Sequence, residues 1–249
     1  MTILRRLAFA SLAAPLALGL AACGSDAGTE AALEAEPVAA VPAPAGQTWS
    51  ETTTVTDFDG YQIGNPAAPI KLVEYGSLTC GACANFTQTG FEQLREKYVD
   101  TGKVSFELRN QVHNGIDLVL ARLVRCSGPD AMVPLSEQVW MNFNDVMNTV
   151  QQNGAAMERA MAMPEAQRFA AAAEAAGLLD FFAARGLSRD QARTCLADVE
   201  SVKAIAERSD QQSKELDVAG TPTFFVNGQK VEANSWDTLE PVLQRAGAR

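Results

Sequence analysis

Residues 70–86, which read IKLVEYGSLTCGACANF, decide the fold of this chain. The stretch opens with six mostly apolar residues, 70–75, whose β-branched and aromatic side chains predict a buried strand. Cys80 and Cys83 follow, and beyond them a helical pattern continues to about Val99. The sequence therefore predicts a strand that leads through two cysteines into a helix, with Cys80 at the helix N-terminus.

Two cysteines separated by two residues can bind a metal, carry a haem or act as a redox dithiol. A structural zinc site needs four ligands, but His113 is the single histidine and the chain has no second CxxC motif. Covalent haem requires a histidine directly after the second cysteine, where Ala84 stands. We therefore expect a redox dithiol that works without a metal and without a cofactor.

The positions of the two cysteines predict how they divide the chemistry. The unpaired N–H groups and partial positive charge of a helix N-terminus stabilise a thiolate at Cys80, and a lowered pKa makes it reactive near neutral pH. Cys83 lies one helical turn further in, where it is less exposed to a partner. We expect Cys80 to attack or be attacked, and Cys83 to resolve the mixed disulfide.

Further strand patterns occur on both sides of a long helical block. Residues 103–109 alternate between apolar and polar side chains, as a half-buried strand does. Two short strand patterns lie within residues 223–231, around the hairpin turn Asn227-Gly228, and residues 236–245 predict a last helix. Strand–helix–strand at the start implies a parallel pair, and the hairpin adds antiparallel strands.

The long block over residues 113–216 shows helical patterns and no convincing strand. One of its helices is expected to begin at Ser188, where the residues SRDQ have the form of a capping box. We therefore predict an α/β fold, a mixed sheet flanked by helices, in two parts over residues 48–112 and 217–249. An all-helical insertion over residues 113–216 separates the two parts.

The composition is that of a globular protein with an acidic balance. Of the 249 residues, 47% are hydrophobic, and 30 acidic against 20 basic residues give a formal net charge of −10. Binding to nucleic acid requires clustered Lys and Arg to neutralise phosphates. The charge therefore argues against a nucleic-acid partner.

The N-terminus has the form of an export signal. Arg5 and Arg6 precede an apolar run over residues 7–20, which is short for a spanning helix of roughly 20 apolar residues. The run ends in LAACG, residues 20–24, which resembles the bacterial lipobox, where cleavage leaves a lipidated cysteine. Five cysteines are an odd number, and lipid on Cys23 leaves four, which is two pairs.

We therefore expect a lipoprotein signal peptide over residues 1–22 and a periplasmic domain anchored to a bacterial membrane by lipid on Cys23. The alternatives are a retained membrane anchor, or a plain cleavage site with a cysteine nearby by accident. Residues 23–47 are nearly all Ala, Glu, Pro, Gly, Ser and Asp, without apolar periodicity, and predict a disordered tether. The choice between inner and outer membrane stays open.

Three segments together resemble the DsbA-like family of bacterial periplasmic thiol–disulfide oxidoreductases, which have the thioredoxin fold. They are residues 70–86, the helical block, and residues 218–231, which read VAGTPTFFVNGQKV. The resemblance covers about residues 60–246. It implies a thioredoxin-like sheet for the two parts that flank the helical insertion.

The resemblance also implies that Pro222 is a cis-proline beside the CxxC motif. In that position it would expose the backbone groups of Thr221, so that a partner strand can pair beside Cys80. About 5–6% of X–Pro bonds in folded proteins are cis, so the sequence alone does not show this isomer. The alternative is a proline that begins a strand.

Three further side chains gain a role from the same resemblance. Glu74 is expected beneath the active site, where a buried carboxyl with a raised pKa exchanges a proton with Cys83. The alternative is a surface Glu on the other face of the strand. Cys126 and Cys195 are expected to form a structural disulfide in the helical block, the alternative being a second pair that cycles.

One departure from the family concerns histidine. Catalytic members often carry His between the two cysteines, where this chain has Ala82. His113 lies in a predicted loop, and we expect it to be solvated and not catalytic. Without the central His, we expect a reduction potential between the roughly −270 mV of thioredoxin and the roughly −120 mV of the strong oxidant DsbA.

The function predicted from these observations is the donation of disulfides to exported proteins by a monomeric enzyme that a membrane redox partner reoxidises. The first alternative is a reductase or isomerase kept reduced by its partner, although no separate dimerisation domain is evident for an isomerase. The second is a lipid-anchored binding module without catalysis. No motif reports the direction of electron flow, which stays open, as do the substrate and the partner.

Overall fold

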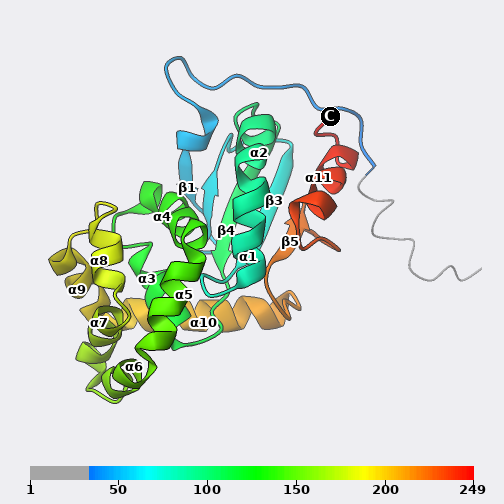
Figure 1. Ribbon diagram of the computed structural model, residues 1–249. Helices are drawn as coiled ribbons and strands as arrows, with labels where there is room; N and C mark the ends of the chain where they lie inside the picture. The colour runs from blue at the N-terminus through cyan, green and yellow to red at the C-terminus, as the bar shows by residue number, and fades with distance from the viewer. Residues whose placement is uncertain (1–33) are drawn as a thin grey trace, which may run out of the picture.

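The computed structural model describes residues 34–249 and contains a six-stranded mixed sheet in the order β1-β2-β4-β3-β5-β6 (Figure 1). The strands are β1 (Thr53–Val55), β2 (Tyr61–Ile63), β3 (Ile70–Gly76), β4 (Val104–Asn110), β5 (Thr223–Val226) and β6 (Gln229–Val231). Strands β3 and β4 run parallel, and all other neighbours are antiparallel. The expected signal peptide over residues 1–22 and the lipidation site Cys23 lie outside the described residues.

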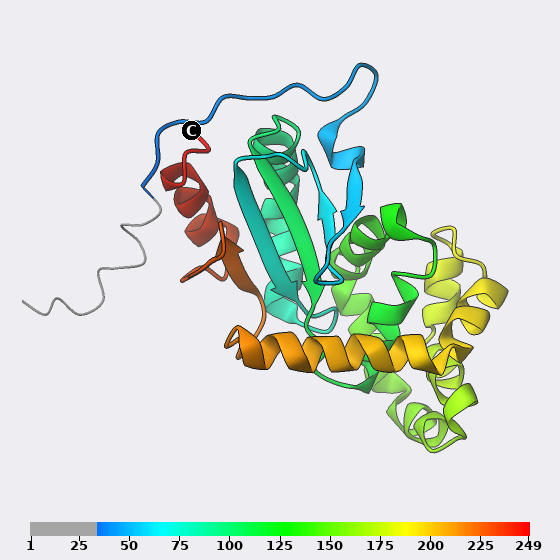
Figure 2. The ribbon, with the colours of Figure 1, turned by 180° about the vertical axis from the view of Figure 1, so that it is seen from behind.

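The helix that begins after Cys80 covers one face of the sheet. It consists of α1 (Gly81–Phe86), η3 (Thr87–Phe91), α2 (Glu92–Leu94) and η4 (Arg95–Val99), which follow one another without a break. The last helix, α11 (Trp236–Arg245), lies on the same face as α1 and α2, while α10 (Val199–Glu215) crosses the opposite face at one end of the strands (Figures 1 and 2). The sheet thus has helices on both faces, as predicted.

The helical insertion is confirmed as a block without strands in the described chain between residues 115 and 215. Besides α10 its helices are α3 (Gly115–Leu123), α4 (Pro129–Met141), α5 (Phe143–Gln152), α6 (Gly154–Met161), α7 (Glu165–Ala175), α8 (Leu178–Ala183) and α9 (Arg189–Ala197). Ser188 caps α9, and Gln191 completes the predicted capping box. Figure 1 shows the insertion as a separate group of helices beside the sheet.

The predicted hairpin at Asn227-Gly228 joins β5 to β6. Both residues have positive φ, 51° and 79°, the backbone that two-residue hairpin turns require. Strand β5 pairs with β3 in a register that sets Thr223 opposite Tyr75 and Phe224 opposite Glu74. The hairpin therefore attaches the chain after the insertion to the strand that leads into the two cysteines.

Two strands were not predicted. β1 and β2 form an antiparallel hairpin, and β2 joins the sheet beside β4. Each has three residues, too few for an alternating pattern to stand out from noise. The turn between them contains Asp59, with φ of 57°, followed by Gly60, and this Asp-Gly pair was the signal available in the sequence.

The expected disordered tether over residues 23–47 is wrong for its described part. Residues 34–47 run across the domain, and the main-chain N–H groups of Ala35, Val38 and Val41 donate to the carbonyls of Arg245, Gly247 and Thr101. The Trp49 indole also donates to the Val41 carbonyl at 2.6 Å. Backbone bonds and one aromatic anchor hold this segment, so its side chains carry no periodic signal.

Candidate active site

The dithiol lies where β3 passes into α1. Cys80 is the N-cap of α1, with extended backbone (φ −96°, ψ 119°), and its Sγ accepts the Cys83 main-chain N–H at 3.2 Å. Both thiols are free in this structure; Cys80 is half-buried, and Cys83 is fully buried. One thiol is thus presented to a partner, and the other is held inside.

The surroundings separate the pKa values of the two thiols. A hydrogen bond from the Cys83 thiol is the largest cause that lowers the pKa of Cys80 to about 5, and a hydrogen bond from Thr221 and the N–H groups at the helix start add to it. Burial opposes this shift for Cys80. Burial is the largest cause that raises the pKa of Cys83 far above that of an ordinary thiol, followed by its bond to Cys80 and the charge of Glu74.

Pro222 lies beside the dithiol, and the Thr221–Pro222 peptide bond is cis. The carbonyl oxygen of Thr221 is 3.3 Å from Cys80 Sγ. Strand β5 begins at Thr223, directly after the proline, and its pairing with β3 holds this loop against the start of α1. The structure therefore brings Thr221 and Pro222 next to Cys80, although about 140 residues separate them from Cys80 in the sequence.

Glu74 lies beneath the dithiol. Alternate residues of a strand point to opposite faces, so Glu74 shares the α1 face with Leu72 and Gly76. The side chain is fully buried, and neither carboxyl oxygen has a hydrogen-bond partner among the described residues. Burial, and then the charge of Cys80, raise the pKa of Glu74 to about 8, so the carboxyl holds a proton at neutral pH.

A second buried carboxyl, Asp117, organises the loops around Cys80 and was not predicted. Its oxygens accept the Leu78 N–H at 2.9 Å, the Ser77 hydroxyl at 2.7 Å and the His113 main-chain N–H at 2.9 Å. Burial is the largest cause that raises its pKa, although these hydrogen bonds oppose the shift. Its position three residues into a helix gave no sequence signal of this role.

His113 contacts the loop that carries the cis-proline. The side chain is exposed in a loop, as predicted, but its Nε2 lies 3.1 Å from Thr221 Oγ1, next to the dithiol. The contact joins residues 108 positions apart. No local pattern reports it, because the loop before α3 meets the cis-proline loop only in the folded chain.

Cys126 and Cys195 form a disulfide with an S–S distance of 2.01 Å and a Cα–Cα distance of 5.9 Å. It connects the turn after α3 to α9, across 69 residues of the helical insertion. The bridge therefore lies within the insertion and takes no part in the contacts around Cys80 described above.

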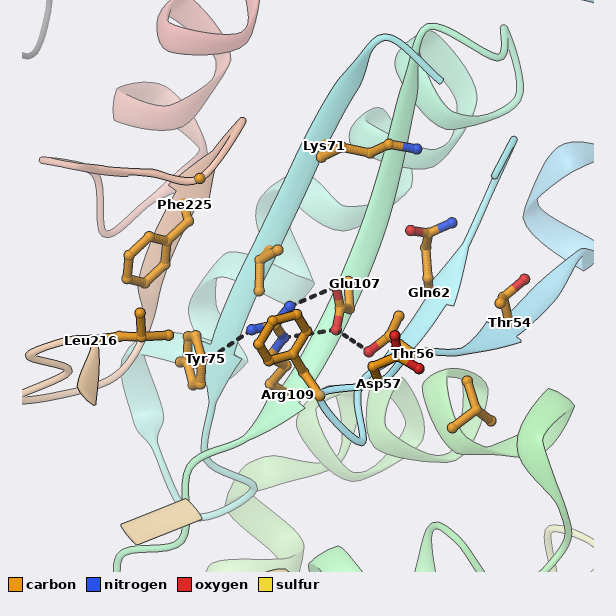
Figure 3. A pocket seen from close by; sticks show the side chains of 14 residues that line it. Thr54, Thr56, Asp57, Gln62, Lys71, Tyr75, Glu107, Arg109, Leu216 and Phe225 are labelled. Atoms are coloured by element: carbon orange, nitrogen blue, oxygen red, sulfur yellow. Dashed lines mark hydrogen bonds and ion pairs between the residues drawn. The ribbon is translucent and has the colours of Figure 1, made fainter. Parts of the chain in front are cut away.

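The cavity in Figure 3 lies on the opposite face of the sheet from the dithiol. It measures about 630 Å³ and is lined by the β3 residues Lys71, Val73 and Tyr75, which alternate with those that face α1. At its floor the Arg109 guanidinium forms a two-point ion pair with Glu107, at 2.7 and 3.0 Å. This cavity is therefore not where a partner would meet Cys80.

The described part of the chain contains no group of three or more His, Cys, Asp or Glu side chains placed to hold a metal ion. From residue 34 onward, no helix combines the length and apolar character needed to cross a membrane.

Comparison with known proteins agrees with this geometry. The sequence model of the family described as thioredoxin matches residues 56–245. A Rickettsia typhi protein named as a protein-disulfide oxidoreductase is 28% identical over 198 residues, which cover 78% of this chain and 66% of the relative. The match thus spans just under two thirds of that relative's own length.

Two solved structures share the fold. A protein-disulfide isomerase from Novosphingobium aromaticivorans superposes with a TM-score of 0.70 at 29% identity, over 75% of this chain and 97% of its own. The α-DsbA1 protein of Wolbachia pipientis gives a TM-score of 0.58 at 22% identity, over 75% and 89%. The chain therefore belongs to the thioredoxin family and shares its fold with these two structures.

Proposed function

We propose that this protein is a thiol–disulfide oxidoreductase that introduces disulfides into exported proteins through Cys80 and Cys83. The observation that carries the proposal is the contrast between a half-buried thiol of low pKa and a buried thiol of high pKa, one helical turn apart. A thiol of low pKa is a good leaving group in thiol–disulfide exchange. The pair is therefore suited to give its disulfide away.

The reaction begins from the Cys80–Cys83 disulfide. A substrate thiolate attacks Cys80 Sγ, the bond to Cys83 breaks, and the leaving Cys83 sulfur takes the proton of Glu74. A second substrate thiolate then attacks the substrate sulfur of the mixed disulfide, and Cys80 leaves as a thiolate. The substrate dithiol has lost two electrons and become a disulfide, and the protein holds one thiolate and one thiol.

Each step draws on a feature of this site. Burial is the larger cause of the raised pKa of Glu74 and also acts in the oxidised protein, so the carboxyl can hold a proton to give to Cys83. Cys83 holds that proton because its thiolate would be buried. Thr221 and the cis Pro222 border the exposed side of Cys80, where the main chain of a substrate would align.

An isomerase is the second candidate, because the Novosphingobium neighbour carries that name. An isomerase must work from the reduced protein, since its Cys80 thiolate opens wrong disulfides in a substrate. The oxidised protein would be active as a disulfide donor, and the reduced protein would be active as an isomerase. Separate assays of the oxidised and the reduced protein therefore distinguish the two functions.

The test uses the full chain with ribonuclease A as substrate. The oxidised protein is expected to restore activity to reduced, unfolded ribonuclease. The reduced Cys83→Ser variant is expected to accumulate a mixed disulfide through Cys80 with scrambled, oxidised ribonuclease, because Cys80 attacks a ribonuclease disulfide and no second cysteine resolves the product. Cys80→Ser should do neither, and Cys126→Ala/Cys195→Ala should retain the activity. Rescue of scrambled ribonuclease by the reduced protein alone would support the isomerase. Equal behaviour of the wild type and Cys80→Ser in these assays would support a binding module.

We infer in addition that the domain acts outside the cytoplasm, anchored through lipid on Cys23, with a membrane protein as its oxidant. The support is the basic and apolar start of the sequence, its LAACG stretch, and a cysteine count that becomes even without Cys23. Expression in bacteria with labelled palmitate should label the chain and not its Cys23→Ala variant. Equal labelling of both would contradict the anchor.

A further inference from the structure

Residues 77–80 form the turn between β3 and α1, and hydrogen bonds within this turn place Cys80. The Ser77 carbonyl accepts the Cys80 main-chain N–H at 3.2 Å, and the Ser77 hydroxyl oxygen accepts the Thr79 N–H at 3.1 Å. At the end of the turn, Cys80 Sγ accepts the Cys83 N–H at 3.2 Å. The position of the sulfur at the start of α1 therefore depends on the shape of this turn.

Two buried side chains of the helical insertion hold the same turn. Asp117, in α3, accepts the Ser77 hydroxyl at 2.7 Å and the Leu78 N–H at 2.9 Å. The Trp140 indole, in α4, donates to the Ser77 carbonyl at 3.0 Å. Asp117 is 1% exposed and Trp140 is 3% exposed, so bulk water does not compete for these bonds. The insertion is therefore attached directly to the segment that presents Cys80.

The carboxylate of Asp117 matches its surroundings because the groups bonded to it are donors. Its Oδ1 accepts the Leu78 N–H, and its Oδ2 accepts the Ser77 hydroxyl and the His113 main-chain N–H. Two of these three groups are main-chain N–H groups, which can only donate. An amide at this position would turn its NH2 group toward at least one of the donors, and that buried donor would lose its acceptor.

We propose that Asp117 is a positioning residue for the dithiol reaction: it holds residues 77–80 in the shape that places Cys80 Sγ against the first N–H groups of α1. The inference rests on the dithiol chemistry of the proposed function. Hydrogen bonds weaken steeply when they are misaligned, and the charge of a helix N-terminus acts only within the first turn. A looser turn should therefore take the sulfur away from the Cys83 N–H and leave fewer Cys80 thiols ionised.

The test measures how fast iodoacetamide alkylates Cys80 in the reduced full chain, with mass spectrometry to distinguish Cys80 from Cys83 and Cys23. At pH 5, near the pKa of Cys80, Asp117→Asn should slow alkylation about twofold to fivefold, since fewer Cys80 thiols are ionised. At pH 8 Cys80 is ionised in both proteins, and their rates should converge. Partial unfolding would instead change the rate at both pH values.

Ser77→Ala separates the effect of position from the effect of charge. It removes the hydroxyl that lies between Asp117 and Thr79, leaves every charged group in place, and should also slow alkylation of Cys80 at pH 5. It decides the test if Asp117→Asn does not fold. Loss of the Asp117 charge alone would have the opposite sign, because a nearby carboxylate raises the pKa of a thiol. The ionisable groups that face Cys80 or Asp117 are the same in both variants: Cys83, Glu74 and His113.

The matched control is Cys126→Ala/Cys195→Ala, which removes the disulfide of the same insertion and leaves residues 77–80 and their partners in place. It should weaken the insertion and still show the wild-type alkylation rate of Cys80 at pH 5. A general loss of stability in the insertion is thereby distinguished from a change in the turn.

Four outcomes would overturn the proposal: a wild-type rate for either variant at pH 5, equal slowing at pH 5 and pH 8, faster alkylation of Asp117→Asn at pH 5, or slowing of the control by the same factor. Alkylation needs no protein substrate. A negative result for Asp117 therefore leaves the disulfide-donor function standing, and failure in the ribonuclease assay leaves the positioning role standing.

Discussion

The carboxyl of Glu74 links the redox chemistry to the dependence of stability on pH. Its pKa is raised from 4.5 to about 8 in the folded protein, so between these values the folded state holds a proton that the unfolded state has lost. The free energy of unfolding therefore falls as pH rises through this window and levels off above it, by about 1.4 kcal/mol per unit of pKa difference. Below pH 4.5 the carboxyl is protonated in both states.

Glu74→Gln is expected to remove this decline. Urea unfolding of the oxidised protein at pH 5 and pH 8 measures it, because Cys80 does not titrate in the disulfide and burial alone then raises the pKa of Glu74. The free energy of unfolding of the wild type should fall between pH 5 and pH 8, and that of the variant should fall much less. An equal loss in both proteins would place the titration elsewhere and contradict the role given to this carboxyl.

The sequence predicted the residues of the site whose signals are local, and it missed those that depend on the fold. Cys80 and Cys83 could be placed at a helix start because the strand, the motif and the helix follow one another. His113 and Asp117 were missed because their partners lie in other loops, 108 and about 40 residues away. Contacts of this kind have no period and no spacing to detect.

The disulfide between the turn after α3 and helix α9 stabilises the insertion without serving the dithiol. Replacing Cys126 and Cys195 by Ala should lower the free energy of unfolding by about 2–4 kcal/mol, because the bridge closes a long loop in the unfolded chain. Urea unfolding measures the loss, and exchange between Cys80–Cys83 and glutathione should proceed at the wild-type rate. Loss of that exchange would show instead that the two disulfides communicate.

Among the elements, length decided what could be predicted. Strands β3 and β4 have seven residues each and α10 has 17, enough for a pattern to emerge. The three-residue strands β1 and β2 and the segment 34–47 were missed for a shared reason: main-chain hydrogen bonds hold them, and these leave little trace in side-chain composition. The hairpin β5–β6 was found despite its short strands because its turn requires Asn and Gly.

The molecule as a whole has two chemically distinct faces on one sheet. The α1 face holds Glu74 and the dithiol, and the other holds the buried pair of Glu107 and Arg109, whose guanidinium lies 4.1 Å from the centre of the Phe58 ring. Thr56 also donates to Glu107. The ion pair on the second face therefore has an electrostatic role that is separate from the dithiol reaction.

Glu107→Gln should lower the free energy of unfolding by about 3–5 kcal/mol, because it leaves the charge of Arg109 buried without its partner. Glu137→Gln, which breaks a partly exposed pair with Arg95, is the matched control and should cost less than about 1 kcal/mol. Urea unfolding compares the two, and alkylation of Cys80 should be unchanged in both. Similar costs at the two sites would contradict the assignment of the buried pair.

The reduction potential of the Cys80–Cys83 pair tests the central claim most directly, by equilibration of the full chain with glutathione buffers. The low pKa of Cys80 stabilises the reduced form, which makes the disulfide easier to give away. We predict a potential above about −180 mV, as a disulfide donor requires. A potential below about −230 mV would mean that the pair prefers to remain a disulfide, and would contradict the proposed direction of electron flow.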